Sequence, residues 1–142
     1  MILIDLNVLL DVVQKREPHY RVSAAVVEAV VQGATEGMLP AHAATTLHYI
    51  VGRYQDRKTA NGVVDWLLRY FAVAPVGREE LLRARALGWT DFEDAVVAAS
   101  AESGGCRAIV TRNVKDFPGS PVEVVTPEEY LMGPDGPGMP PA

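Results

Sequence analysis

The sequence contains a single cysteine in 142 residues, and this scarcity excludes two kinds of stabilising site. Cys106 has no partner for an intramolecular disulfide, and one thiol cannot supply a cysteine-based zinc site. Chains without disulfides are typical of reducing compartments, so we expect a cytoplasmic protein.

Long hydrophobic runs are also absent. Uninterrupted apolar stretches such as 1–4, 24–27 and 95–99 are only a few residues long, whereas a membrane-spanning helix needs about 18 or more. Asp5 interrupts the first stretch too early for the hydrophobic region of a secretory signal. We therefore expect no membrane span and no secretion. With 49% apolar residues, the chain is instead long enough for one globular domain with a substantial core.

Basic residues are in the minority, with 13 Lys and Arg against 18 Asp and Glu and a net charge of −5. This balance argues against a protein that coats nucleic acid through bulk electrostatics. The acidic residues are unevenly placed, because 91–142 holds nine of them and only three basic residues. That region is either an ordinary solvated surface or a place where carboxylates are gathered for a purpose.

Short apolar runs alternate with amphipathic stretches along the chain. The runs predict strands at 1–4, 38–40, 71–75, 108–110 and 122–125. The amphipathic stretches predict helices at 7–13, 19–36, 43–54, 59–70, 78–86, 90–103 and 127–131. This alternation predicts an α/β fold with a mostly parallel sheet covered by helices on both faces.

The domain is predicted to cover 1–131. Residues 132–142 contain four prolines and three glycines without apolar periodicity, which predicts a disordered tail, with a docking peptide as the alternative. Thr90 and Glu93 fit a capping box at the start of the helix 90–103, so acidic residues there also have a structural reason to exist.

Three aspartates are predicted to meet at one edge of the sheet. Asp5 directly follows the first strand, Asp116 lies in the segment after the strand 108–110, and Asp94 lies near a helix start. Such carboxylates would repel one another in a poorly solvated cleft unless a hard divalent cation offset their charge. Mg²⁺ or Mn²⁺ would do so, and this predicts metal-assisted chemistry on phosphodiesters.

Neighbouring residues extend this prediction. Asp91 precedes Asp94 by three residues, so the two carboxylates share a helix face. The side chains that follow the strand 108–110 suit contacts with a substrate phosphate: Thr111, Arg112, Asn113 and Lys115. The alternative is structural, with Asp91 and Glu93 as helix-start acids and Asp116 as a turn residue.

Three segments resemble the PIN domain family, particularly the VapC-type toxins. They are 2–11 (ILIDLNVLLD), 91–95 (DFEDA) and 109–117 (IVTRNVKDF), and their order and spacing cover nearly the whole chain. The resemblance implies a three-layer α/β/α sandwich with a central, mostly parallel five-stranded sheet. It also implies a metal-dependent endoribonuclease that acts as the toxin of a type II toxin–antitoxin pair.

The resemblance assigns roles to individual residues. Asp5 and Asp94 match the family's first and third acids, and Asp116 matches the fourth, with Asn113 as a second candidate for that place. Asp91 would be an auxiliary acid. The implied cofactor is Mg²⁺ or Mn²⁺, and the implied partners are an RNA substrate, a cognate antitoxin protein and a second copy of the chain in a homodimer.

One departure from the family concerns its second acid, which usually lies on the helix after the second strand. The sequence has no carboxylate between Glu36 and Asp56, and the residues in that region are His48, Thr45 and Thr46. Imidazole binds Mn²⁺ but is a poor ligand for Mg²⁺, so this difference bears on metal preference and catalysis. A lone histidine on a half-apolar helix is otherwise explained as a structural residue.

Two other functions are compatible with these residues. A chain without the second acid would be a PIN-fold module that binds RNA or protein without cutting. An acid after the first strand also suits a haloacid-dehalogenase-like phosphatase or a receiver domain. The phosphatase requires a second Asp where Asn7 stands, and the receiver requires paired acids and a lysine that the sequence lacks.

Overall fold

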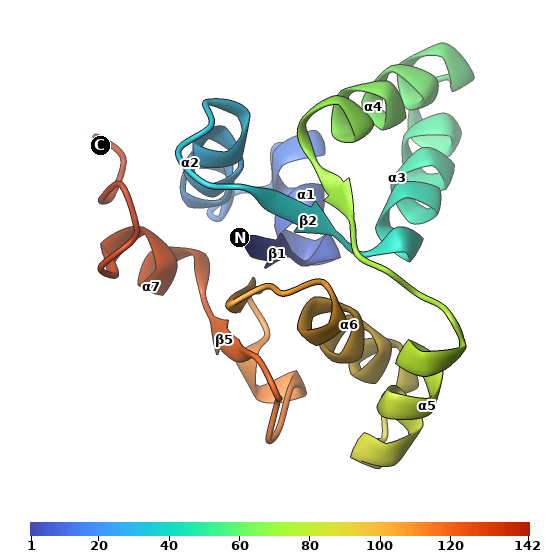
Figure 1. The fold of residues 1–142 in the computed structure, drawn as a ribbon. Helices are drawn as coiled ribbons and strands as arrows, with labels where there is room; N and C mark the ends of the chain where they lie inside the picture. Colours follow the sequence, from blue (N-terminus) through green and yellow to red (C-terminus); the bar gives the residue numbers. More distant parts are fainter.

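The computed structural model describes residues 1–142 as a five-stranded sheet between two layers of helices (Figure 1). The strands are β1 (Ile2–Ile4), β2 (Gly37–Leu39), β3 (Ala72–Val73), β4 (Ala108–Val110) and β5 (Glu123–Val125). The helices are α1 (Leu6–Val13), α2 (Tyr20–Val31), α3 (Ala41–Tyr54), α4 (Arg57–Tyr70), α5 (Arg78–Leu87), α6 (Phe92–Ser103) and α7 (Pro127–Met132), with a 3₁₀ turn, η1 (Val114–Asp116).

The strand order is β3-β2-β1-β4-β5, and every neighbouring pair is parallel. Chain order runs outward from β1 through β2 to β3, and then resumes on the other side of β1 with β4 and β5. The direction of winding therefore changes between β1 and β4. In open parallel sheets, ligand sites form beyond the carboxyl ends of the strands at such a change.

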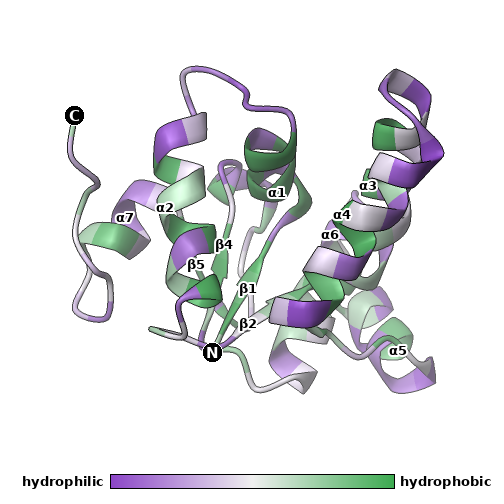
Figure 2. Ribbon diagram, turned by 90° about the horizontal axis from the view of Figure 1, so that it is seen from above, coloured by the Kyte–Doolittle hydropathy of each residue, from purple (hydrophilic) through white to green (hydrophobic).

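Successive side chains of the central strands point to opposite faces of the sheet and contribute to two hydrophobic cores, one on each face. Ile2 and Ile4 of β1 pack with α1, α2, α3, α4 and α7, whereas Leu3 packs with α6 on the opposite face. In β4, Val110 and Ile109 are divided in the same way. Figure 2 shows β1 and β4 as hydrophobic strands between helices with polar outer faces. The predicted α/β/α sandwich with a parallel five-stranded sheet is confirmed.

Helix α6 lies between the sheet and α5. Its Val97, Ala98 and Ala101 face the sheet, whereas Ala95 and Ala99 pack against Ala84 of α5. Small side chains on both faces allow this close approach, and they explain why the sequence of α6 is rich in alanine. The packing fixes the start of α6 near the carboxyl ends of β1 and β4.

Most element boundaries differ from those predicted by one or two residues, and two of the differences have a clear local cause. The helix expected at 19–36 ends at Val31, because Gly33 takes a left-handed conformation with φ of 80° that breaks the helical path. The helix expected to be capped by Thr90 starts at Phe92, because the Asp91 side chain accepts the hydrogen bond from the Asp94 amide instead. Thr and Asp are both favoured N-cap residues, with Asp the stronger, and both stand at the start of this helix.

The C-terminal segment after α7 folds back on the domain. The Arg107 guanidinium lies 2.7 Å from the Asp135 carboxylate, and the Gly138 amide donates to the carbonyl oxygen of Leu131. Arg21 of α2 donates to the carbonyl of Pro140. A Cβ on Gly136 would clash with the carbonyl oxygens at the end of α7, so glycine permits this close approach.

Among the seven α-helices, none has both the length and the apolar character that a membrane span requires.

Candidate active site

Asp5 is held at the carboxyl end of the central strand by two neighbours. Its Oδ1 accepts a hydrogen bond from the Leu6 amide at 2.8 Å, so the side chain also caps α1. Its Oδ2 accepts from the Thr111 hydroxyl at 2.9 Å. Burial raises the pKa of Asp5, while these two hydrogen bonds oppose the increase. The carboxylate is thus fixed in position and only 8% exposed.

Asn7 joins the ends of β1 and β4 around this carboxylate. Its side-chain amide donates to the Thr111 hydroxyl at 3.1 Å, and its oxygen accepts from the Arg112 amide at 3.2 Å. The Asn113 amide completes the network by donating to the same hydroxyl. These bonds connect residues more than 100 positions apart in the sequence, and they set the loop after β4 relative to Asp5.

A pocket of about 150 Å³ opens directly beyond these strand ends. Its nine lining residues include four carboxylates and one imidazole but neither lysine nor arginine. They come from the ends of β1 and β4, the start of α3, the start of α6 and η1: Asp5, Leu6, Asn7, His42, Glu93, Asp94, Asn113, Asp116 and Phe117. The three predicted acids Asp5, Asp94 and Asp116 therefore line one pocket.

The electrostatic consequence is clearest at Asp94. Partial burial, followed by repulsion from Asp91, Asp5, Asp116 and Glu93, raises its pKa from 3.8 to about 7. Burial disfavours the charged form of the carboxyl group, and the neighbouring acids add repulsion that no lysine or arginine in the pocket lining offsets. Perturbed carboxyl groups of this kind are characteristic of functional sites.

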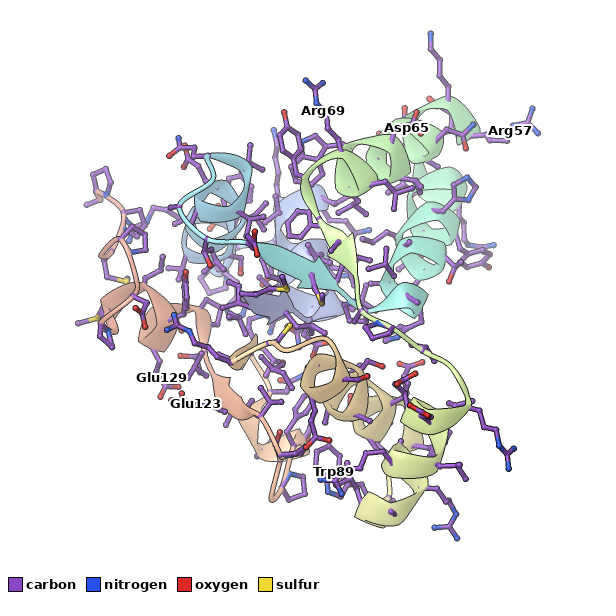
Figure 3. The ribbon with its side chains drawn as sticks, viewed as in Figure 1. Arg57, Asp65, Arg69, Trp89, Glu123 and Glu129 are labelled. Carbon is purple, nitrogen blue, oxygen red and sulfur yellow. The ribbon has the colours of Figure 1, made fainter.

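Asp91 and Lys115 lie beside the pocket, where they line a second hollow of about 270 Å³. Asp94 and Asp116 line both spaces, so the two are adjacent. The wall of the second hollow includes Trp89, which meets the buried Phe117 edge to face at 5.8 Å. Figure 3 shows Trp89 close to α5 and α6, on the side of the molecule opposite α4.

The residues predicted to contact a phosphate differ in their availability. The Thr111 side chain is fully buried and holds Asp5, so it positions an acid and does not face solvent. Arg112 forms two hydrogen bonds with the carboxylate of Asp11, at 2.8 and 3.2 Å, and Asp11 is fully buried. Of the four, Asn113 lines the pocket and Lys115 lines the adjacent hollow, both exposed.

The residues considered for the missing second acid lie outside the pocket. His48 contacts Asn61 of α4, with 2.8 Å between its Nε2 and the Asn61 Oδ1. Thr45 is exposed and donates to the His42 carbonyl, and Thr46 is absent from the pocket lining. The α3 residue that does reach the pocket is His42, whose Nε2 lies 3.5 Å from Glu93 Oε1.

Sequence reasoning overlooked His42 and Asn7 and treated Glu93 only as a helix-start acid. Position in the fold was the available signal for His42, because it follows the carboxyl end of β2 by three residues and so reaches the same sheet edge as Asp5. For Asn7, the signal was its place two residues after Asp5, at the start of the first helix.

The donor set of the pocket suits a hard divalent cation. Carboxylate and amide oxygens are the preferred ligands of Mg²⁺ and Mn²⁺, and neither cysteine nor a second histidine is present. No three of the ionisable side chains lie close enough together to hold one ion as they stand. Glu93 and Asp116 are exposed and can rotate toward a cation, whereas Asp5 is already fixed.

A family model described as PIN domain matches residues 1–115 of this chain. The sequence matches no curated protein.

Solved structures share the fold at low sequence identity. A toxin–antitoxin complex from Klebsiella pneumoniae superposes with a TM-score of 0.67 at 22% identity, and VapBC-1 from nontypeable Haemophilus influenzae with 0.68 at 16%. Both alignments cover 89% of this chain and 98% of the other. VapC20 from Mycobacterium tuberculosis, a toxin that cleaves the sarcin–ricin loop, superposes with a TM-score of 0.60 at 12% identity, over 77% of this chain and 87% of that one.

Proposed function

The chain belongs to the PIN domain family, and from this starting point we propose that it is a metal-dependent endoribonuclease that acts as the toxin of a type II toxin–antitoxin pair. One observation carries the proposal: Asp5, Glu93, Asp94 and Asp116 line a single pocket that contains no lysine or arginine. A pocket with this charge disfavours a phosphodiester unless a cation is also bound.

Asp5, Asp94 and Asp116 are the residues that would hold Mg²⁺ or Mn²⁺. The ion, when bound, would activate water and offset the charge that develops on the phosphodiester. The protein supplies the positions of the ligands. Thr111 and the Leu6 amide fix Asp5, and the capped start of α6 presents Asp94.

Substrate contacts are proposed at the rim. Asn113 lines the pocket, and Lys115 lines the adjacent hollow, so both are placed to contact phosphates on either side of the reacting group. Arg112 would contribute indirectly, because its guanidinium is engaged by Asp11. Asp91 would act as an auxiliary acid whose charge makes the electrostatic potential at Asp94 more negative.

A cognate antitoxin and a homodimer are part of the proposal. The antitoxin is supported by the fold shared with VapBC-1 and with the toxin–antitoxin complex from Klebsiella pneumoniae. The homodimer is proposed from the resemblance to VapC-type toxins. A toxin that acts on cellular RNA is expected in the cytoplasm. The alternative, a PIN-fold module that binds RNA or protein without cutting, is favoured by one observation, namely that α3 brings no carboxylate to the pocket.

The test is cleavage of RNA by the purified chain with Mg²⁺ or Mn²⁺, with and without EDTA. Asp94→Asn is the informative variant, because Asp94 is partly exposed and the amide is the same size, whereas Asp5 also caps α1. We expect cleavage, and growth arrest on expression, to fall by ~100-fold or more, as for loss of a metal ligand or catalytic acid. Glu128→Gln, an exposed change on α7, is the control.

Equal cleavage by Asp94→Asn and wild type would contradict the proposed site. Binding of Mn²⁺ and RNA without any cleavage would favour the non-cutting module.

A further inference from the structure

The α3 side of the pocket lacks the acid that the family resemblance leads one to expect. Helix α3 contains no Asp or Glu anywhere along its fourteen residues. Its one contribution to the pocket lining is His42, in the first turn. Imidazole is a weak ligand for Mg²⁺, so His42 does not replace a carboxylate directly.

A carboxylate from another helix occupies this side of the pocket. Glu93 lies in the first turn of α6, next to Asp94, and its Oε1 is 3.5 Å from Nε2 of His42. It therefore reaches across from α6 toward α3. The negative charge of Glu93 acts within the pocket, since it contributes to the raised pKa of both Asp5 and Asp94.

The helix dipole favours an acid in the first turn of α6, but the cap of that helix does not require Glu93. Asp91 already caps α6 by accepting from the Asp94 amide, and Glu93 forms no hydrogen bond with the backbone. Its side chain is 66% exposed, so it adds little to packing. A fourth carboxylate beside Asp94 is electrostatically unfavourable in the metal-free chain, and that cost is reversed when a divalent cation is bound.

We propose that Glu93 supplies the metal-facing carboxylate that α3 lacks, and that His42 is the positioning residue that holds it toward the pocket. The inference rests on the proposed metal site and adds to it a ligand from a different helix. Ligating carboxylates are commonly oriented by a polar neighbour, here an imidazole at an ion-pair distance of 3.5 Å, and loss of such a neighbour weakens metal binding by ~10- to 100-fold.

Isothermal titration with Mn²⁺, in the absence of RNA, tests the proposal without reference to activity. Glu93→Gln removes the charge and keeps the size of the side chain, and Glu128→Gln is the matched control. We expect Glu93→Gln to bind Mn²⁺ at least ~10-fold more weakly than wild type and Glu128→Gln to bind it equally well. Far-UV circular dichroism in EDTA should show both variants folded, because both residues are exposed.

An exchange variant separates a ligand from a general charge effect. His42→Glu combined with Glu93→Gln moves the carboxylate back to α3 while the pocket keeps four acids. We expect it to recover Mn²⁺ affinity relative to Glu93→Gln alone. His42→Gln, which keeps a hydrogen-bond donor, should bind Mn²⁺ more tightly than His42→Leu, which removes the donor.

The outcomes distinguish this inference from the proposed function. If Asp94→Asn loses Mn²⁺ binding while Glu93→Gln binds as well as Glu128→Gln, Glu93 is not a ligand and the metal site stands without it. If the wild type binds no Mn²⁺ at millimolar concentration, the proposed metal site fails and this inference fails with it.

Discussion

At the scale of single residues, the carboxyl group of Asp94 links the charge of the pocket to the stability of the metal-free protein. Its pKa is raised to about 7 in the folded chain, chiefly by burial and then by repulsion from neighbouring acids. In the unfolded chain, it titrates near its ordinary value of 3.8. Folding therefore favours the protonated form, and the stability this provides is complete below about pH 4 and is lost as the pH rises to about 7.

Asp94→Asn is expected to abolish this loss of folding stability at high pH. In EDTA, the variant should be more stable than wild type at pH 8 by on the order of 1–2 kcal/mol, a figure reduced for the solvent that reaches this partly exposed group. At pH 4, the two proteins should unfold with nearly equal free energies. Urea unfolding at the two pH values measures the difference, and a variant less stable than wild type at pH 8 would contradict the assignment.

The same residue illustrates what the sequence could reveal about the site. Asp5, Asp94 and Asp116 were placed together by one rule, that polar residues after parallel strands and at helix starts meet at one sheet edge. The raised pKa of Asp94 was beyond that rule, because it depends on the burial of the carboxyl group and on its distances to four other carboxylates. The approach of His42 to Glu93 was also hidden, since it requires the starts of α3 and α6 to face each other in space.

At the scale of elements, a buried ion pair ties three of them together. Arg112, just after β4, forms two hydrogen bonds with Asp11 of α1, and Ser23 of α2 donates to the same carboxylate at 2.8 Å. The arrangement fixes the loop that leads to Asp116. Arg112, predicted as a phosphate contact, therefore faces inward toward Asp11. The sequence alone did not reveal this partner, because it lies 101 residues away.

Arg112→Met is expected to destabilise the protein by about 3–5 kcal/mol, because it leaves the Asp11 charge buried without a cationic partner. The double variant Asp11→Leu with Arg112→Met should recover part of this loss, although Ser23 then lacks its acceptor. Urea unfolding of the two variants at pH 7 measures both effects. Equal destabilisation of the single and double variants would show that the ion pair is not the cause.

Strands were predictable where a short apolar run stood between turn residues. Strands were expected at 38–40 and 108–110, and the structure has strands at Gly37–Leu39 and Ala108–Val110. The helix 19–36 was predicted too long because apolar spacing continues past Val31, while the break depends on the backbone angle of Gly33. Apolar periodicity indicates which residues can face a core, but it does not indicate at which residue a helix ends.

At the scale of the whole molecule, the basic residues of α4 lie apart from the acidic pocket. Arg57 and Arg69 project from α4 away from the body of the domain (Figure 3). Arg57 begins α4 at the far end of the α3–α4 hairpin, on the order of 20 Å along α3 from His42. The acidic pocket and this basic helix are therefore distinct surfaces of the molecule, and the net charge of −5 describes neither.

The boundary of the domain after α7 remains a prediction that truncation tests. A chain that stops at Met132 loses the half-exposed Arg107–Asp135 ion pair, the Gly138 to Leu131 hydrogen bond and the Arg21 to Pro140 hydrogen bond. Contacts of these kinds contribute about 1 kcal/mol or less each, so we expect the free energy of unfolding to fall by no more than about 3 kcal/mol. Failure of the shortened chain to fold would place the tail within the domain.

The order β3-β2-β1-β4-β5 also has a consequence during synthesis on the ribosome. Asp5 is among the first residues made, yet the hydroxyl that holds it belongs to Thr111, 106 positions later. At about 5–20 residues per second, translation separates them by roughly 5–20 s. Until β4 emerges, β1 lacks one of its two neighbours and the acids have no common pocket. A nascent or prematurely terminated chain therefore lacks the pocket, and only a nearly finished polypeptide can assemble it.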